Sequence, residues 1–187
     1  MKILAALSWL LALGAPAHAD VQLKVVTAKG YVAFVAVDDW HVLTMESRLP
    51  VATVVFQLPN PADEGTPEST NLVLILYDLA TRKGRTGFEQ PIPQYGDDPK
   101  PETAAGGWTL YRQSGIQNST QYTVLDARRT AVADVAASVR LAWPHLPNNP
   151  QDYDARMEST FRAFLDSIEG HLGDFKPSKG EVVRRPR

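Results

Sequence analysis

The sequence contains no cysteine among its 187 residues. Disulfide bonds, thiolate-bound zinc, iron–sulfur clusters and thiol catalysis are therefore excluded together. Lys and Arg number 19 against 21 Asp and Glu, which gives a formal net charge of −2. No long block of basic residues is present, so a nucleic-acid-binding surface is not indicated, because such proteins concentrate positive charge in one segment or on one face.

Motifs that carry chemistry are also missing. Neither of the glycine-rich motifs that bind phosphate groups, G-x-x-x-x-G-K-[ST] and G-x-G-x-x-G, occurs in the chain. His41, His145 and His171 lie too far apart in sequence for the H-E-x-x-H spacing of a zinc enzyme. Ser114 lacks the preceding glycine of a nucleophile elbow. We therefore predict no catalytic residue and no cofactor, and we expect that the protein is not an enzyme.

The first nineteen residues are typical of a secretory signal peptide. Lys2 precedes an apolar run over residues 3–13, Pro16 interrupts it, and Ala17-His18-Ala19 forms an A-x-A cleavage site. The apolar run is too short to cross a hydrocarbon layer of ~30 Å, and no other stretch is longer. We expect cleavage after Ala19, a periplasmic or secreted location, and no membrane span.

The remaining chain has the size of one domain. Residues 20–175 are expected to form a single globular domain, because they are enough for one hydrophobic core and too few for two. Residues 176–187 are basic and contain proline, which predicts a flexible tail.

Runs of β-branched and apolar residues predict a mainly antiparallel sheet. Gly30 separates the first two runs and favours a hairpin between them. The continuous apolar run Leu72–Tyr77 predicts a central strand that is buried on both faces. Alternation over residues 133–143 predicts a half-buried strand. The strands are expected at residues 21–27, 31–37, 42–46, 51–58, 72–77, 108–113, 121–127 and 133–143.

The last predicted element is a helix. It is expected to begin at Asp152 or Asp154 and to end near Gly170 or Gly173. Its apolar residues follow a period of 3.6 and so form one stripe that can pack on a sheet. The predicted fold class is therefore α+β, a mainly antiparallel sheet with flanking helices and a long C-terminal helix packed on the sheet. The stripe consists of Met157, Phe161, Phe164, Leu165, Ile168 and Leu172.

The order of these elements resembles the PsbP/DcrB-like family of periplasmic domains. The strand before Asp38-Asp39-Trp40 is similar to the family opening F-x-[IV]-x-x-P-x-x-W, although Asp38 stands where the family has proline. The ending Asp166-Ser167-Ile168 is similar to the family's I-L-x-S-[IF] helix. The resemblance implies an α/β sandwich and a binding or assembly module without shared catalytic residues.

A segment rich in proline and glycine, Phe88–Gly107, is predicted to be a long loop without secondary structure. Its proline content limits the entropy that is lost when a partner immobilises it. Tyr95 offers an amphipathic ring, while Asp97 and Asp98 offer negative charge that can steer a basic partner. These three residues are the candidate partner-binding residues, and the partner is expected to be a protein.

Two carboxylates before the C-terminal helix are weak candidates for a calcium site. Asp152 and Asp154 follow two asparagines, and closely spaced oxygen ligands suit Ca²⁺. The alternative is that they stabilise the N-terminus of the helix. The spacing does not match an EF-hand, and both interpretations remain open.

The sequence as a whole favours a non-catalytic exported binding or assembly module that acts through protein–protein contacts. A first alternative is an immunity protein that neutralises a periplasm-targeted type VI secretion toxin, with the acidic loop inserted into the toxin. A second alternative is a hydrolase of envelope polymers that uses paired carboxylates.

Overall fold

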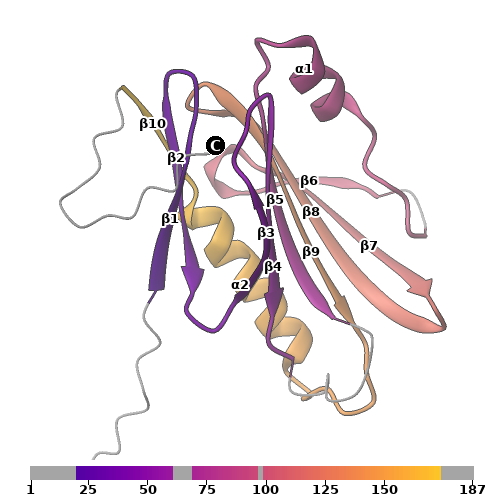
Figure 1. Cartoon of the computed structure of the whole chain (residues 1–187). Coiled ribbons are helices and arrows are strands. Elements are labelled where there is room, and N and C mark those ends of the chain that lie inside the picture. Colours follow the sequence, from indigo (N-terminus) through magenta and orange to yellow (C-terminus); the bar gives the residue numbers. More distant parts are fainter. Residues whose placement is uncertain (1–19, 61–68, 97–98, 174–187) are drawn as a thin grey trace, which may run out of the picture.

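The computed structural model describes residues 20–60, 69–96 and 99–173, arranged as two antiparallel sheets and two helices (Figure 1). The smaller sheet has the strand order β1-β2-β10. Its strands are β1 (Asp20–Val26), β2 (Gly30–Val37) and β10 (Glu169–Leu172). The expected signal peptide and the basic tail over residues 176–187 lie outside the described residues.

The larger sheet has seven strands in the order β3-β4-β5-β9-β8-β7-β6. Helix α2 (Tyr153–Ser167) and the shorter helix α1 (Arg82–Glu89) flank it, and a 3₁₀ turn covers Ala105–Gly107. The fold is therefore mixed α+β and mainly β, as the sequence predicted, and each expected strand is present. The strands are β3 (His41–Glu46), β4 (Val51–Leu58), β5 (Thr70–Tyr77), β6 (Pro101–Thr103), β7 (Thr109–Gln117), β8 (Thr120–Val132) and β9 (Val135–Pro144).

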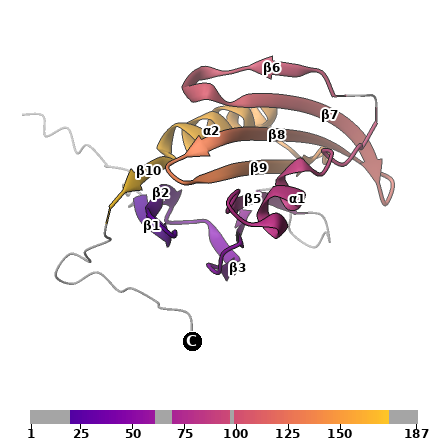
Figure 2. The same cartoon turned by 90° about the horizontal axis from the view of Figure 1, so that it is seen from above.

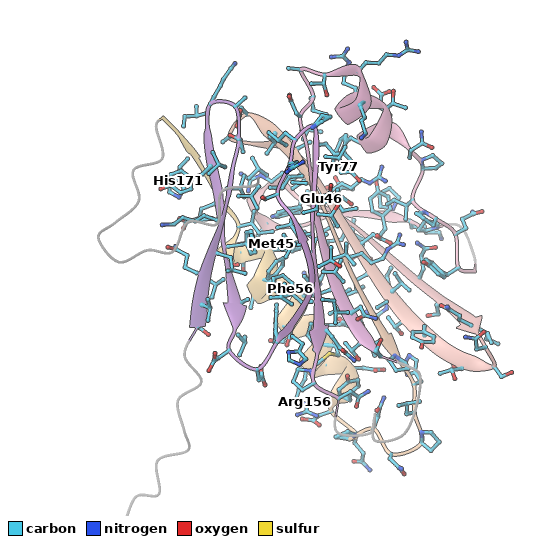
Figure 3. All side chains as sticks on the ribbon, in the orientation of Figure 1. Met45, Glu46, Phe56, Tyr77, Arg156 and His171 are labelled. Carbon is cyan, nitrogen blue, oxygen red and sulfur yellow. The ribbon has the colours of Figure 1, made fainter. Side chains whose placement is uncertain are left out.

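Helix α2 joins the two sheets. The predicted stripe residues from Met157 to Ile168 are buried, whereas Leu172 lies on β10 and is 70% exposed, so its place in the stripe was wrong. The ring of Phe164 lies 5.9 Å from that of Phe34 on β2 and 6.2 Å from that of Phe56 on β4, centroid to centroid. Figure 2 shows the helix on one face of the large sheet, with β1 and β2 beside it. We call the face toward α2 the inner face and the opposite one the outer face. Figure 3 shows Phe56 near the middle of the molecule.

The position of Leu72–Tyr77 differs from the prediction. Strand β5 is third in the sheet, and β9 is the central strand. The inner-face residues of β5 are buried, whereas Asn71, Val73 and Ile75 on the outer face are only half-buried. The reason is that helix α2 covers the inner face, while α1 and a short connecting segment cover only part of the outer face. The apolar run therefore predicted the strand correctly, but its central position and its burial on both faces were predicted wrongly.

The segment Phe88–Gly107 is not one structureless loop, and this prediction was wrong. It contains the end of α1, the strand β6 and the 3₁₀ turn. Helix α1 begins after Thr81, whose hydroxyl accepts a hydrogen bond from the Gly84 N–H at 3.0 Å. The helix could not be predicted from the spacing of its apolar residues, because it contains two glycines and few apolar residues.

The C-terminal helix begins where the sequence indicated, with Asp152 at the N-cap position. It ends earlier than expected, at Ser167, whose Oγ accepts the Val35 N–H at 3.1 Å and donates to the Phe164 carbonyl at 2.7 Å. The residues after it form β10, which pairs with β2. No helix in the described part of the chain is long and apolar enough to cross a membrane.

Candidate functional site

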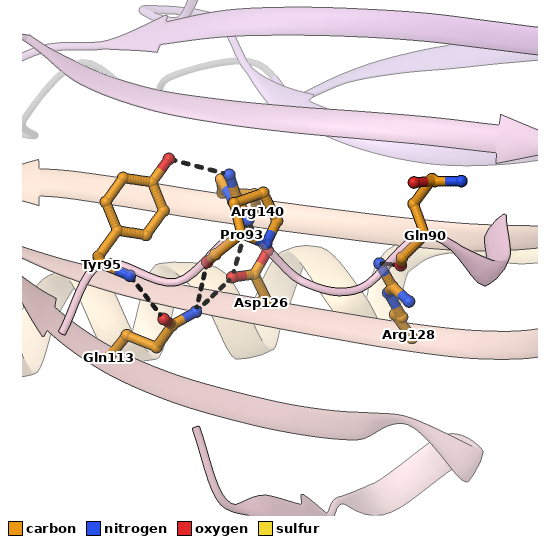
Figure 4. Close-up of polar contacts among 7 residues, drawn as sticks. All are labelled: Gln90, Pro93, Tyr95, Gln113, Asp126, Arg128 and Arg140. Carbon is orange, nitrogen blue, oxygen red and sulfur yellow. Dashed lines mark hydrogen bonds and ion pairs between the residues drawn. The ribbon is translucent and has the colours of Figure 1, made fainter. Parts of the chain in front are cut away.

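Four polar side chains lie together on the outer face of the large sheet, where β7, β8 and β9 run side by side (Figure 4). They are Gln113 on β7, Asp126 and Arg128 on β8, and Arg140 on β9. Asp126 faces Arg140 across the β8–β9 pairing, so the two charges are neighbours in the sheet. The segment 90–96, between α1 and β6, crosses this cluster.

Asp126 and Arg140 form a bidentate ion pair. The Arg140 Nε donates to Asp126 Oδ1 at 2.8 Å, and Nη2 donates to Oδ2 at 3.1 Å. The Asp126 side chain is 4% exposed, against 24% for Arg140. Burial raises the pKa of Asp126 above its usual 3.8, and the charges of Arg140 and Arg128 and the hydrogen bonds from Arg140 and Gln113 oppose that rise. The Asp126 carboxylate thus forms a buried ion pair with Arg140 that has a structural role.

The same cluster holds segment 90–96 on the sheet. Gln113 Oε1 accepts the Tyr95 N–H at 3.0 Å, and Gln113 Nε2 donates to the Pro93 carbonyl at 3.2 Å. Arg128 donates to the carbonyls of Phe88 at 3.1 Å and Gln90 at 2.8 Å. These bonds satisfy backbone groups that the proline-rich segment cannot pair within itself. The segment is therefore ordered by side chains of the sheet.

Close approach to β7 requires glycine at one position. A Cβ added to Gly115 would lie 2.0 Å from the Tyr95 carbonyl oxygen. Gly115→Ala is therefore expected to lift Tyr95 away from the sheet and to increase amide hydrogen exchange over residues 93–96, while exchange in α2 stays unchanged. Ser114→Ala, at the exposed neighbouring residue, is the matched control. Unchanged exchange over residues 93–96 in Gly115→Ala would contradict this contact.

Tyr95 occupies a fixed position on the surface. Its hydroxyl accepts a hydrogen bond from Arg140 Nη1 at 3.1 Å, and the Arg140 guanidinium lies 5.3 Å from its ring centroid. The residue is still 39% exposed. The other two candidate partner-binding residues, Asp97 and Asp98, lie outside the described residues.

A small cavity adjoins Tyr95. Its volume is about 220 Å³, and its lining includes Ile116, which is 79% exposed and whose side chain points to the opposite face of the sheet from Gly115 because side chains alternate along β7. None of the lining residues carries a charge. The Asn71 amide nitrogen donates to Ser69 Oγ at 2.7 Å, whereas its buried oxygen has no hydrogen bond among the described residues. The cavity is lined by Ser69, Asn71, Tyr95, Gly115, Ile116, Gln117, Asn118, Tyr122, Val124 and Ala142.

This arrangement is suited to binding. We name the surface formed by Tyr95, the cavity beside it and the end of β7 around Ile116 the Tyr95–Ile116 patch. An aromatic ring that is held in place beside a pre-formed cavity is a feature of positions that dominate protein interfaces. The cavity can take an uncharged side chain or a small neutral group, because a charged one would be desolvated there without a partner.

The candidate calcium ligands have other contacts. Asp154 Oδ1 accepts the Trp143 indole N–H at 2.8 Å and lies 3.7 Å from His145 Nδ1. Asp152 Oδ2 lies 3.4 Å from Arg156 Nε, and its side chain makes no cap hydrogen bond. In the described ranges no three His, Asp or Glu side chains come together as a metal site would require. Calcium binding by Asp152 and Asp154 stays an untested hypothesis.

The sequence analysis found Tyr95 but missed Ile116 and the polar cluster. The alternation over residues 133–143 places Arg140 on the polar face of its strand, whereas no pattern in the sequence marked Gln113 or Asp126. The signal that could have identified Asp126 and Arg140 is a charged residue between two apolar residues in a predicted strand. These residues come together only because β7, β8 and β9 are adjacent in the sheet, and the sequence does not reveal this strand order.

Known proteins offer little similarity. No family model matches the chain, and no curated protein matches it. Among solved structures, LpqN of Mycobacterium tuberculosis, described as involved in cell envelope biogenesis, is similar with a TM-score of 0.39 and 18% sequence identity. The match covers 84% of this chain and 86% of that one. The PsbP/DcrB-like family resemblance is not confirmed by these comparisons.

Proposed function

We propose that this chain is an exported, non-catalytic binding module that acts through protein–protein contacts at the Tyr95–Ile116 patch. The observation that carries the proposal is the 39% exposure of Tyr95, whose position is fixed by Gln113 and Arg140, at the rim of an uncharged cavity. In this proposal a partner inserts a neutral side chain into the cavity.

The polar cluster supports this role by fixing the patch before binding. Tyr95 is held through its backbone N–H by Gln113 and through its hydroxyl by Arg140. A partner therefore loses less free energy in ordering the patch than it would with an unrestrained loop. The charged groups beneath the patch serve as its support, and Asp126, the buried carboxylate, is neutralised by Arg140. Its pairing favours the non-catalytic role over the hydrolase alternative.

Photo-crosslinking tests the proposal directly. Benzoylphenylalanine at Gln117, an exposed lining residue on the same face as Gly115, is expected to give one discrete protein adduct on irradiation in cells that naturally produce the protein. Tyr95→Ala in the same chain should reduce the adduct at least about tenfold, because an aromatic residue at the centre of an interface contributes 2 kcal/mol or more. The control places the crosslinker at Arg162, an exposed residue of α2.

Two results would oppose the proposal: an equal adduct at both positions, or an adduct at Gln117 that is insensitive to Tyr95→Ala. The identity of the adduct also separates the toxin-neutralising alternative from the assembly module, because the former requires an enzyme as the crosslinked protein. Asp97 and Asp98, on which that alternative depends, lie outside the described residues, and no described contact favours it.

A further inference from the structure

Helix α1 concentrates positive charge at one end of the large sheet. Arg82, Lys83 and Arg85 are exposed in its first part, and the first turn holds no acidic residue. The chain as a whole has a net charge of −2, so this cluster is a local exception. The partial positive charge of a helix N-terminus adds to the charge of the side chains.

Two of these cations are free to bind a ligand. Arg85 Nη1 donates to the carbonyls of Leu79 at 2.8 Å and Ala80 at 3.1 Å, so Arg85 stabilises the turn before the helix. Arg82 and Lys83 make neither an ion pair nor a hydrogen bond through their side chains within the described ranges. Both side chains border the same groove.

The groove runs between α1 and the outer face of the sheet. Its volume is about 650 Å³, which is within the ~300–1,000 Å³ typical of small-molecule sites. Residues 82, 83, 86, 87 and 90 form its helical side, and this spacing places them on one face of α1. Val51 and Tyr77, which are paired across β4 and β5, form its sheet side. Figure 3 places Tyr77 next to α1.

The exposed lining of the groove is mostly apolar. Val51, Tyr77 and Gly87 contribute to it, and Thr86 and Gln90 add polar groups on the helical side. A Cβ added to Gly87 would lie 3.0 Å from Tyr77 Cε1, so a larger residue there would narrow the groove over the ring. Free positive charge at one end and apolar surface along the rest match a ligand with one charged end and one apolar chain.

We propose that this groove binds a single-chain amphiphile with a phosphate headgroup. The alkyl or acyl chain lies along Val51 and Tyr77, and the phosphate contacts Arg82 and Lys83 at the N-terminus of α1, where anions are favoured. An acidic protein segment would leave the apolar part unused, and a zwitterionic headgroup would place a positive charge beside two cations. This surface is separate from the Tyr95–Ile116 patch, so the inference does not depend on the proposed function.

Alkyl phosphates of increasing length, each kept below its micelle concentration, are the probes. Calorimetry on the purified chain is expected to give binding that tightens roughly two- to fourfold per added methylene between octyl and dodecyl phosphate. Dodecylphosphocholine has the same chain with a zwitterionic headgroup and should bind at least tenfold more weakly than dodecyl phosphate. Inorganic phosphate and hexaglutamate, which lack an apolar chain, should bind more weakly still.

Variants locate the site. Arg82→Glu with Lys83→Glu should weaken dodecyl phosphate binding by tenfold or more, and Thr86→Phe should weaken it by filling the groove. Lys100→Glu with Arg162→Glu makes the same change in net charge at exposed positions outside the groove and should leave the affinity unchanged. In ¹⁵N-labelled protein, the amide shifts of Gly84 and Gly87 should respond to dodecyl phosphate. Circular dichroism checks that each variant keeps its fold.

Several outcomes would overturn the proposal. They are no binding of dodecyl phosphate, equal binding of dodecylphosphocholine or hexaglutamate, and an affinity that does not depend on chain length. A loss of affinity in the Lys100→Glu, Arg162→Glu control as large as in the groove variant would show nonspecific attraction. Amide shifts that leave Gly84 and Gly87 unchanged would place the ligand elsewhere.

Discussion

Replacing Phe164 with alanine is expected to lower the free energy of unfolding by about 3–5 kcal/mol. The Phe164 side chain is 2% exposed, and its ring contacts Phe34 from the small sheet and Phe56 from the large one. It also lies 5.8 Å from the Trp40 ring, centroid to centroid. Removal of the ring therefore leaves a cavity where both sheets and α2 meet, and a denaturant titration followed by tryptophan fluorescence measures the loss.

The matched controls lie in the same helix. Arg162→Ala changes an exposed residue of α2 and should alter the free energy of unfolding by no more than ~0.5 kcal/mol. Phe164→Leu keeps much of the apolar volume, so its loss of unfolding free energy should lie between those of Phe164→Ala and Arg162→Ala. If Phe164→Ala and Arg162→Ala destabilised the protein equally and slightly, α2 would not be the element that joins the two sheets.

The second large effect is expected at the ion pair beneath the Tyr95–Ile116 patch. Arg140→Met leaves the buried Asp126 carboxylate without its cation and should lower the free energy of unfolding by about 3–5 kcal/mol. The same change removes the hydrogen bond to the Tyr95 hydroxyl. Chemical denaturation at neutral pH measures the loss, and hydrogen exchange over residues 93–96 reports whether Tyr95 is released.

A double variant separates the two contributions. Asp126→Leu with Arg140→Met removes both charges, so no unpaired carboxylate remains buried, and its stability should exceed that of Arg140→Met alone. Tyr95→Phe removes only the hydroxyl and should cost at most ~1.5 kcal/mol. A double variant no more stable than the single one would show that desolvation of Asp126 is not the dominant cost.

Much of the fold could be predicted because it depends on local patterns. Alternation gave the strands, and the 3.6-residue stripe from Met157 to Ile168 gave α2. Helix α1 could not be found this way, because its eight residues include two glycines and only one large apolar residue, Phe88, which packs against Tyr77. Strand β10 was also missed, because it is only four residues long and pairs with residues of β2 more than a hundred positions away.

The candidate site shows the same limit. Tyr95 was identified from an amphipathic ring in a proline-rich segment, but what fixes it depends on long-range contacts with Gln113 and Arg140. Ile116 was missed because it lies beyond the predicted strand at residues 108–113, whereas β7 extends to Gln117. Its exposure follows from the length of the β7–β8 hairpin, whose tip extends past the sheet (Figure 1).

The central claim, that the Tyr95–Ile116 patch is the partner-binding surface, is tested most directly by hydrogen exchange of the protein alone and with the partner identified by crosslinking. We predict protection of residues 93–96 and 115–118 in the complex, with little change in β1 and β2. Protection confined to β1, β2 or the exposed edge strand β3, with residues 93–96 and 115–118 exchanging as in the free protein, would contradict it.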